Sequence, residues 1–123
     1  MDSEELKKRT KSFSIRVIKL VEALPKSDTA RIIGNQLLRS ATSVGANYRS
    51  ALRARSKADF ISKIGIVIEE TDESLYWMEL LAEINLISKE RLSELMQEAN
   101  ELTSIFVTTV KSTRENMRRK AAK

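Results

Sequence analysis

The chain has 123 residues, with 22 Lys and Arg against 17 Asp and Glu, and it contains neither histidine nor cysteine. Its length suits one domain with its own hydrophobic core. The lack of cysteine excludes disulfides and thiolate metal sites. The lack of histidine excludes histidine-based general bases, nucleophilic triads and the Glu-x-x-His sites of di-iron bundles. The net charge of +5 favours an anionic partner.

The N-terminal sequence has no features of a secreted protein. It mixes acids with Lys7, Lys8 and Arg9, and it does not lead into an apolar signal core. Apolar runs along the chain are only a few residues long, which is too short to cross a membrane. We therefore expect a cytoplasmic location.

One proline and three glycines, with abundant Leu, Ala, Glu, Lys and Arg, predict an all-α domain. The first helix is expected over residues 5–24, where Leu6, Phe13, Val17 and Leu20 recur at helical spacing. Pro25 ends it, because proline disfavours helical geometry in the residue before it.

The second helix, expected over residues 29–55, contains small residues on its apolar side. On a helical wheel Gly34, Ala41 and Gly45 form a shallow groove on that side. Close helix packing explains this pattern, and a ligand or nucleic-acid site is the alternative. Because a large side chain would fill the groove, Gly45→Leu is expected to disrupt folding or assembly.

The third helix is expected over residues 57–84, after a Ser-x-x-Asp capping box at Ser56. Its apolar residues form two stripes, of which one suffices to face a bundle core. The second stripe predicts contact with another subunit. It comprises Ile66, Trp77, Leu81 and Ile84.

A fourth amphipathic helix is expected over residues 88–115, with Ser88 as its N-cap, and a basic flexible tail over 116–123. Four long helices with short connections predict an antiparallel up-down-up-down four-helix bundle over residues 1–115. No Gly-rich phosphate loop or nucleophile elbow occurs. The acids of the third helix indicate a solvated face, with Mg²⁺ or Ca²⁺ binding as a weaker alternative. We expect no enzyme, no cofactor and no metal.

The basic residues carry the functional signal, because repeated long cations suit phosphate backbones. Residues 26–57 have a net charge of +6 and residues 58–87 one of −6, so pairing of the arginines with acids of the third helix is the alternative. Further cations near the start are Arg9 and Lys11. The candidate nucleic-acid-binding residues are Arg31, Arg39, Arg49, Arg53, Lys7, Lys8, Arg118 and Arg119.

Four segments carry a family resemblance: Leu24–Lys26, Gln36–Asn47, Ser56–Phe60 and Glu73–Leu81. From about Phe13 to Val110 the chain resembles the bacterial four-helix bundle proteins encoded in ribosomal RNA intervening sequences. The resemblance implies a homopentamer. A related branch, the accessory variability determinants of diversity-generating retroelements, implies nucleic acid and a reverse transcriptase as partners.

One segment departs from the family pattern. Many members have an acidic residue and glycine after Gly-Ala-Asn, whereas Tyr48 and Arg49 follow here. The resemblance supplies no catalytic residues. We therefore expect a non-enzymatic oligomeric scaffold that binds RNA or DNA backbones. The alternative is a protein-interaction scaffold that docks an acidic partner and has no nucleic-acid role.

Overall fold

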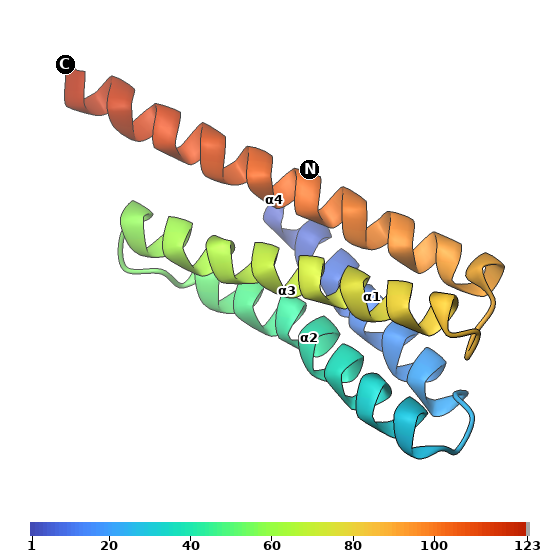
Figure 1. Ribbon diagram of the computed structural model, residues 1–123. Coiled ribbons are helices and arrows are strands. Elements are labelled where there is room, and N and C mark those ends of the chain that lie inside the picture. The colour runs from blue at the N-terminus through green and yellow to red at the C-terminus, as the bar shows by residue number, and fades with distance from the viewer. Residues whose placement is uncertain (123) are drawn as a thin grey trace.

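The computed structural model describes residues 1–122. These residues form four helices, α1 (Ser3–Glu22), α2 (Asp28–Leu52), α3 (Lys57–Glu83) and α4 (Lys89–Ala122), which pack as a bundle (Figure 1). No strand occurs in this range. The predicted all-α four-helix fold is therefore confirmed. None of the helices in residues 1–122 is long and apolar enough to cross a membrane.

Serine caps begin three of the helices, and the sequence predicts those at Ser56 and Ser88. The Ser27 hydroxyl accepts the Ala30 N–H at 3.1 Å, and Ser56 accepts the Asp59 N–H at 3.0 Å. Ser88 accepts the Arg91 N–H at 3.3 Å. Each cap satisfies a backbone donor that has no partner inside the helix. Local hydrogen bonding therefore sets where α2, α3 and α4 start.

α4 extends further than predicted. The sequence placed its end near residue 115, with a flexible tail beyond, whereas the helix continues to Ala122. Residues 111–122 contain no proline or glycine and consist mainly of good helix formers, so nothing local ends the helix earlier. Arg119 also pairs with Glu115 one turn before it, at 3.1 Å. Lys123 lies outside the described residues.

Helices that follow one another in sequence pack side by side, and α1 also touches α4 over a shorter stretch. Phe13, Leu37, Ile64, Leu102 and Phe106 are among the fully buried side chains of the core. Hydroxyl pairs cross two of the interfaces, Ser74 to Ser40 at 3.0 Å and Thr103 to Thr71 at 2.9 Å. Within residues 1–122 no buried side-chain polar atom lacks a partner.

The small residues of α2 face α1. A Cβ on Gly34 would lie 3.0 Å from Leu24 Cδ1, which is too close without a shift of that side chain. A Cβ on Gly45 would lie 3.4 Å from Thr10 Oγ1, an ordinary contact distance. Ala41 is fully buried, and its carbonyl accepts the Ser14 hydroxyl at 3.0 Å. The close approach is therefore tight at Gly34 and looser at Gly45.

Candidate nucleic-acid interface

A basic groove lies between α1 and α2, with a volume of about 450 Å³. α1 contributes three lysines and a serine, and α2 contributes Thr42, Gly45, Ala46 and Arg49. We call this surface the α1–α2 groove. Its residues are Lys7, Lys8, Lys11, Ser14, Thr42, Gly45, Ala46 and Arg49.

Helical spacing brings these side chains to one surface. Lys7, Lys11 and Ser14 are separated by four and three residues on α1, so they lie on one side of that helix. Gly45 and Ala46 have little or no side chain. The groove is open at this point for that reason, and long cationic side chains surround it. Such an arrangement suits an extended anion better than a compact apolar ligand.

The groove is electropositive because its lining contains four cations and no carboxylate. Lys7 pairs with Glu4 one turn before it, at 3.2 Å. Lys8, Lys11 and Arg49 form no ion pair with any residue of the described range 1–122. Three cations are therefore available to an external anion.

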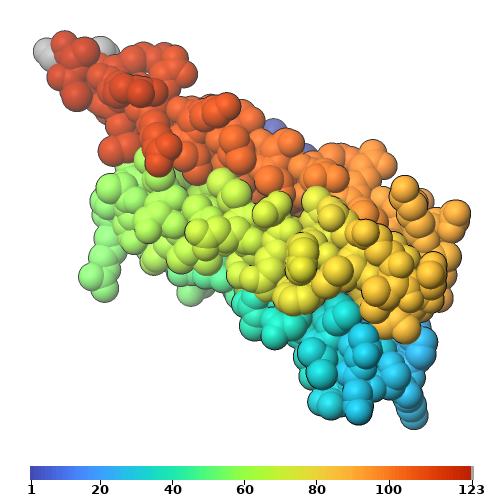
Figure 2. Space-filling view, in the orientation of Figure 1, coloured from blue at the N-terminus to red at the C-terminus, as the bar shows by residue number. Residues whose placement is uncertain are grey.

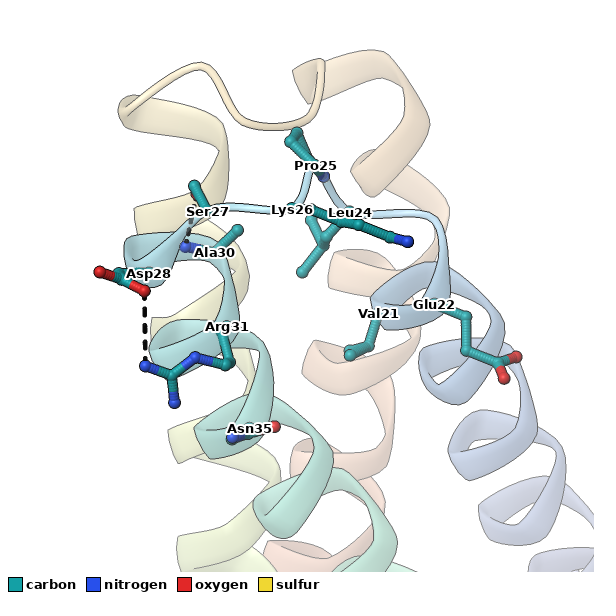
Figure 3. Close-up of a pocket in the computed structure, with 10 residues that line it drawn as sticks. All are labelled: Val21, Glu22, Leu24, Pro25, Lys26, Ser27, Asp28, Ala30, Arg31 and Asn35. Atoms are coloured by element: carbon teal, nitrogen blue, oxygen red, sulfur yellow. Dashed lines mark hydrogen bonds and ion pairs between the residues drawn. The ribbon is translucent and has the colours of Figure 1, made fainter.

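Two predicted residues, Arg31 and Arg39, lie away from this groove. Arg31 pairs with Asp28 at 3.6 Å, beside a pocket of about 470 Å³ at the α1–α2 connection (Figure 3). Glu22 and Lys26 also line that pocket, so its charges are mixed. A mixed lining has no net attraction for phosphates. We remove Arg31 from the candidate interface.

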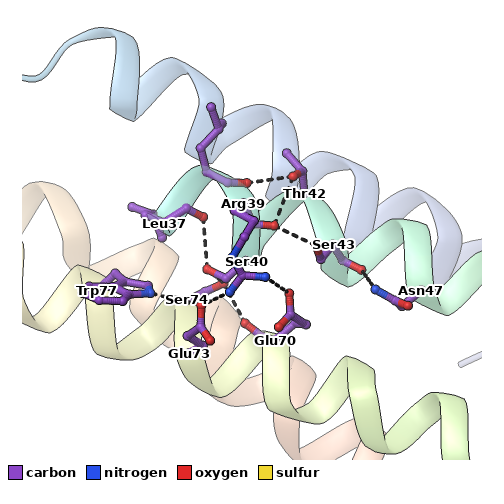
Figure 4. A network of polar contacts seen from close by, with 11 residues as sticks. Leu37, Arg39, Ser40, Thr42, Ser43, Asn47, Glu70, Glu73, Ser74 and Trp77 are labelled. Atoms are coloured by element: carbon purple, nitrogen blue, oxygen red, sulfur yellow. Dashed lines mark hydrogen bonds and ion pairs between the residues drawn. The ribbon is translucent and has the colours of Figure 1, made fainter. Parts of the chain in front are cut away.

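Arg39 pairs with acids of α3. This is the alternative that the sequence analysis gives for the arginines. Its guanidinium lies 3.0 Å from Glu70 Oε2 and also pairs with Glu73 (Figure 4). Attraction to Glu70 and the hydrogen bond to Glu73 raise the pKa of Arg39. Glu73 in turn accepts the Trp77 indole N–H at 3.2 Å. Arg39 therefore links α2 to α3 and is also removed from the interface.

The remaining predicted cations lie near the groove or beyond it. Arg53 is the C-cap of α2, one turn after Arg49, and is exposed. Arg118 and Arg119 are exposed near the end of α4, where Arg119 pairs with Glu115. The structure thus brings Lys7, Lys8 and Arg49 together and leaves these three arginines outside the groove.

Lys11 lines the groove although it is not among the nucleic-acid-binding residues predicted from the sequence. Its spacing of four residues from Lys7 is the signal that would have identified it. Arg9, in the same basic cluster of the sequence, points to the other side of α1. It donates to Glu98 at 2.7 Å and to Glu101 at 2.8 Å, and these bonds raise its pKa. Arg9 therefore holds α1 against α4.

The predicted second apolar stripe is partly exposed. Ile66 is 42% exposed, Ile84 is 44% exposed and Trp77 is half-buried. Leu81 is fully buried, because it lies on the same side of α3 as Met78 and Ser74 and packs in the core. Leu81 is therefore a helix-packing residue and not part of the exposed surface. The residues that remain on this side of α3 are called the exposed apolar stripe (Ile66, Trp77 and Ile84).

No group of three or more acidic, histidine or cysteine residues in the described chain is placed to hold a metal ion. The acids of α3 are used differently: Glu70 and Glu73 bind Arg39. Two surfaces suited to recognition are the α1–α2 groove and the exposed apolar stripe.

Two comparisons place this bundle among known proteins. Residues 3–108 match the family described as 23S rRNA-intervening sequence protein. A crystal structure of a protein of unknown function from the S23 ribosomal protein family of Bacteroides thetaiotaomicron is 32% identical, with a TM-score of 0.84 over 90% of this chain and 99% of that chain. No curated protein matches. The relation to retroelement proteins stays a prediction. The chain belongs to the 23S rRNA-intervening sequence protein family.

Proposed function

We propose that this protein is a non-enzymatic, antiparallel four-helix scaffold that binds RNA or DNA backbones in its α1–α2 groove. The observation that carries the proposal is the convergence of Lys7, Lys8, Lys11 and Arg49 from two helices on a groove without carboxylates. Lysine and arginine that neutralise phosphates release condensed counterions, and this release favours binding strongly at low salt.

Recognition of this kind would depend little on sequence. The groove offers ammonium and guanidinium groups with two hydroxyls, Ser14 and Thr42, and these groups contact phosphate and sugar. Aromatic side chains on which bases could stack do not line it. We therefore expect similar affinities for unrelated sequences and a steep fall of affinity with salt.

Assembly as a homopentamer is part of the proposal. The exposed apolar stripe supports an oligomer, since such a stripe loses contact with water when another subunit covers it. The number five comes from the resemblance described above. A ring would repeat the groove in each subunit and raise the avidity for a long polyanion. A reverse transcriptase as protein partner is proposed on the resemblance alone.

Fluorescence anisotropy with labelled single-stranded RNA and DNA over a salt series tests the binding. In the variant Lys8→Gln/Lys11→Gln/Arg49→Gln we expect weaker binding and a salt slope smaller by roughly 0.7 per lost contact. The control Lys19→Gln/Lys89→Gln/Arg91→Gln removes the same charge from exposed sites outside the groove. Equal losses of affinity in the two triple variants would show that binding depends on the net charge of the protein and not on the groove. Unchanged binding in the groove variant would leave docking of an acidic protein as the function.

Light scattering tests the assembly. The double variant Ile66→Glu/Ile84→Glu places two charges on the exposed apolar stripe and is expected to lower the mass to that of one chain. Ile15→Glu, on α1, changes another isoleucine that is 45% exposed and is the matched control. A monomeric mass for the unmodified protein at micromolar concentration would contradict the assembly, while another oligomer would contradict only the number five.

A further inference from the structure

A second group of cations lies where the end of α4 passes the start of α3. A cavity of about 350 Å³ there is lined by Ala58 and Ile61 of α3 and by Arg114, Met117 and Arg118 of α4. Figure 2 shows α4 projecting beyond the start of α3 at this end of the molecule. Its lining combines three apolar side chains with two guanidinium groups. It is separate from the α1–α2 groove, since the two surfaces share no lining residue.

Two lysines lie next to this cavity. Lys57 is the first residue of α3, directly before Ala58, and Lys120 follows Arg118 by two residues on α4. Side-chain contact with Lys120 and repulsion between the two ammonium groups lower the pKa of Lys57. We name Lys57, Arg114, Arg118 and Lys120 the α3–α4 cation cluster.

Nearby acids do not offset these charges. Asp59 is paired with Lys63 at 3.4 Å, and Glu115 is paired with Arg119 at 3.1 Å. None of the four cluster residues has an ion pair within residues 1–122. The positive end of the α3 dipole also lies here, because Lys57 begins that helix. The folded chain therefore holds like charges together without an internal counter-ion.

We propose that the α3–α4 cation cluster binds a phosphate dianion, either free hydrogen phosphate or the terminal monoester phosphate of a nucleic-acid strand. A monoester carries nearly two negative charges at neutral pH and three acceptor oxygens. Its charge can offset two neighbouring ammonium groups, whereas an internal phosphodiester offsets one. The guanidinium groups of Arg114 and Arg118 suit paired oxygens because their donors form a planar fork.

Titration with inorganic phosphate at pH 8 and constant ionic strength, followed by backbone NMR, tests the site directly. We expect saturable shifts confined to residues 57–61 and 114–120. Arg114→Gln/Arg118→Gln should weaken this binding at least tenfold. The equally charged control Lys89→Gln/Arg91→Gln should leave it unchanged. No saturable shift in the unmodified protein, or equal affinity in the Arg114→Gln/Arg118→Gln variant, would overturn the inference.

Oligonucleotides distinguish the two sources of phosphate. One sequence is compared with a 5′-phosphate and with a 5′-hydroxyl. If the strand end is the ligand, the phosphorylated form binds roughly tenfold more tightly, which corresponds to one strong charged contact. If the two oligonucleotides bind with equal affinity and inorganic phosphate still binds saturably, the site is assigned to free phosphate.

The inference does not depend on the proposed role of the groove, because inorganic phosphate alone decides it. The groove variant Lys8→Gln/Lys11→Gln/Arg49→Gln should weaken both oligonucleotides equally and leave the phosphate titration unchanged. A second cluster variant, Lys57→Gln/Lys120→Gln, relieves the repulsion, so it should fold at least as stably as the unmodified protein while binding phosphate less. Retained phosphate affinity in that variant would contradict a role for the two lysines.

Discussion

The α1–α2 interface differs between its two ends. Near the connection, Val21 of α1 and Leu24, which follows α1, close over Gly34 so tightly that a Cβ would lie 3.3 Å and 3.0 Å from them. At the other end, Gly45 keeps ordinary distances from Thr10 and lines an open basic groove. Two glycines on the same side of one helix therefore have different roles. One allows helices to pack closely, and the other leaves space on the surface.

The charges are divided along the bundle in the same way. The half that contains the four cations of the groove and the end of α4, residues 1–12, 41–70 and 104–122, has 14 basic and 7 acidic side chains. The other half, residues 13–40 and 71–103, has 7 basic and 10 acidic ones. Arg16, Arg31 and Arg39 in that second half all have acidic partners. Free cations are therefore concentrated at one end of the molecule.

The largest expected effect separates the two glycines. Gly34→Leu places a large side chain against Leu24 and Val21, and overpacking of this kind costs about 3 kcal/mol. At Gly45 a Cβ would keep ordinary contact distances of 3.4–3.6 Å from Thr10 beside the groove, so Gly45→Leu should cost less than about 1 kcal/mol in the free energy of unfolding, while weakening nucleic-acid binding. The sequence predicts that Gly45→Leu disrupts folding or assembly, and the ordinary contact distances at Gly45 make an effect smaller than that of Gly34→Leu the expected outcome. Thermal unfolding and anisotropy on both variants measure the difference, and equal destabilisation would contradict it.

Arg9→Gln tests the contact between α1 and α4. The change removes three charged hydrogen bonds and leaves Glu98, whose side chain is only 15% exposed, without its partner. We expect a loss of about 2 kcal/mol in the free energy of unfolding. Nucleic-acid affinity should stay unchanged because Arg9 does not line the groove. Lys8→Gln, at the preceding position, is the control and should show the opposite pattern.

Arg39 and Arg49 give a smaller and reciprocal effect. Arg39→Gln breaks the link to Glu70 and Glu73, so it should lower the melting temperature slightly and leave the salt slope of binding unchanged. Arg49→Gln should leave the melting temperature unchanged and reduce the slope by roughly 0.7 on single strands. If both variants change the slope equally, the arginines of α2 act as one surface and the assignment of Arg39 to packing is wrong.

The smallest expected effect is a dependence on pH at the start of α3. The Arg55 N–H and the Lys63 ammonium lower the pKa of Asp59 below its ordinary value of 3.8. A carboxylate with a lowered folded pKa contributes stability that is fully present above 3.8 and is lost as the pH falls through the folded pKa. Asp59→Ala should therefore lower the melting temperature at pH 6 and much less in strong acid. Ser56→Ala removes an uncharged cap, so its effect should not follow this curve.

Local sequence signals determined most of the fold. Apolar residues at helical spacing, the stop at Pro25 and the caps Ser56 and Ser88 predict four helices close to those observed, because each signal acts within one or two turns. The ends were less accurate. α2 ends at Leu52, three residues before its predicted end, and α4 reaches Ala122. Propensity alone rarely marks where a helix stops when no glycine or proline follows.

Only the tertiary structure decided which cations are free. The sequence places Arg31, Arg39 and Arg49 on one broad arc of α2. In the structure, Arg39 pairs with Glu70 of α3, whereas Arg49 lines the groove together with the lysines of α1. Leu81 likewise proved to be core, and Lys11 proved to line the groove. The physical reason is that helical periodicity fixes the direction in which a side chain points around the axis of its helix. The partners of that side chain depend on how far each neighbouring helix is shifted along the same axis. That shift is set by packing of the whole bundle.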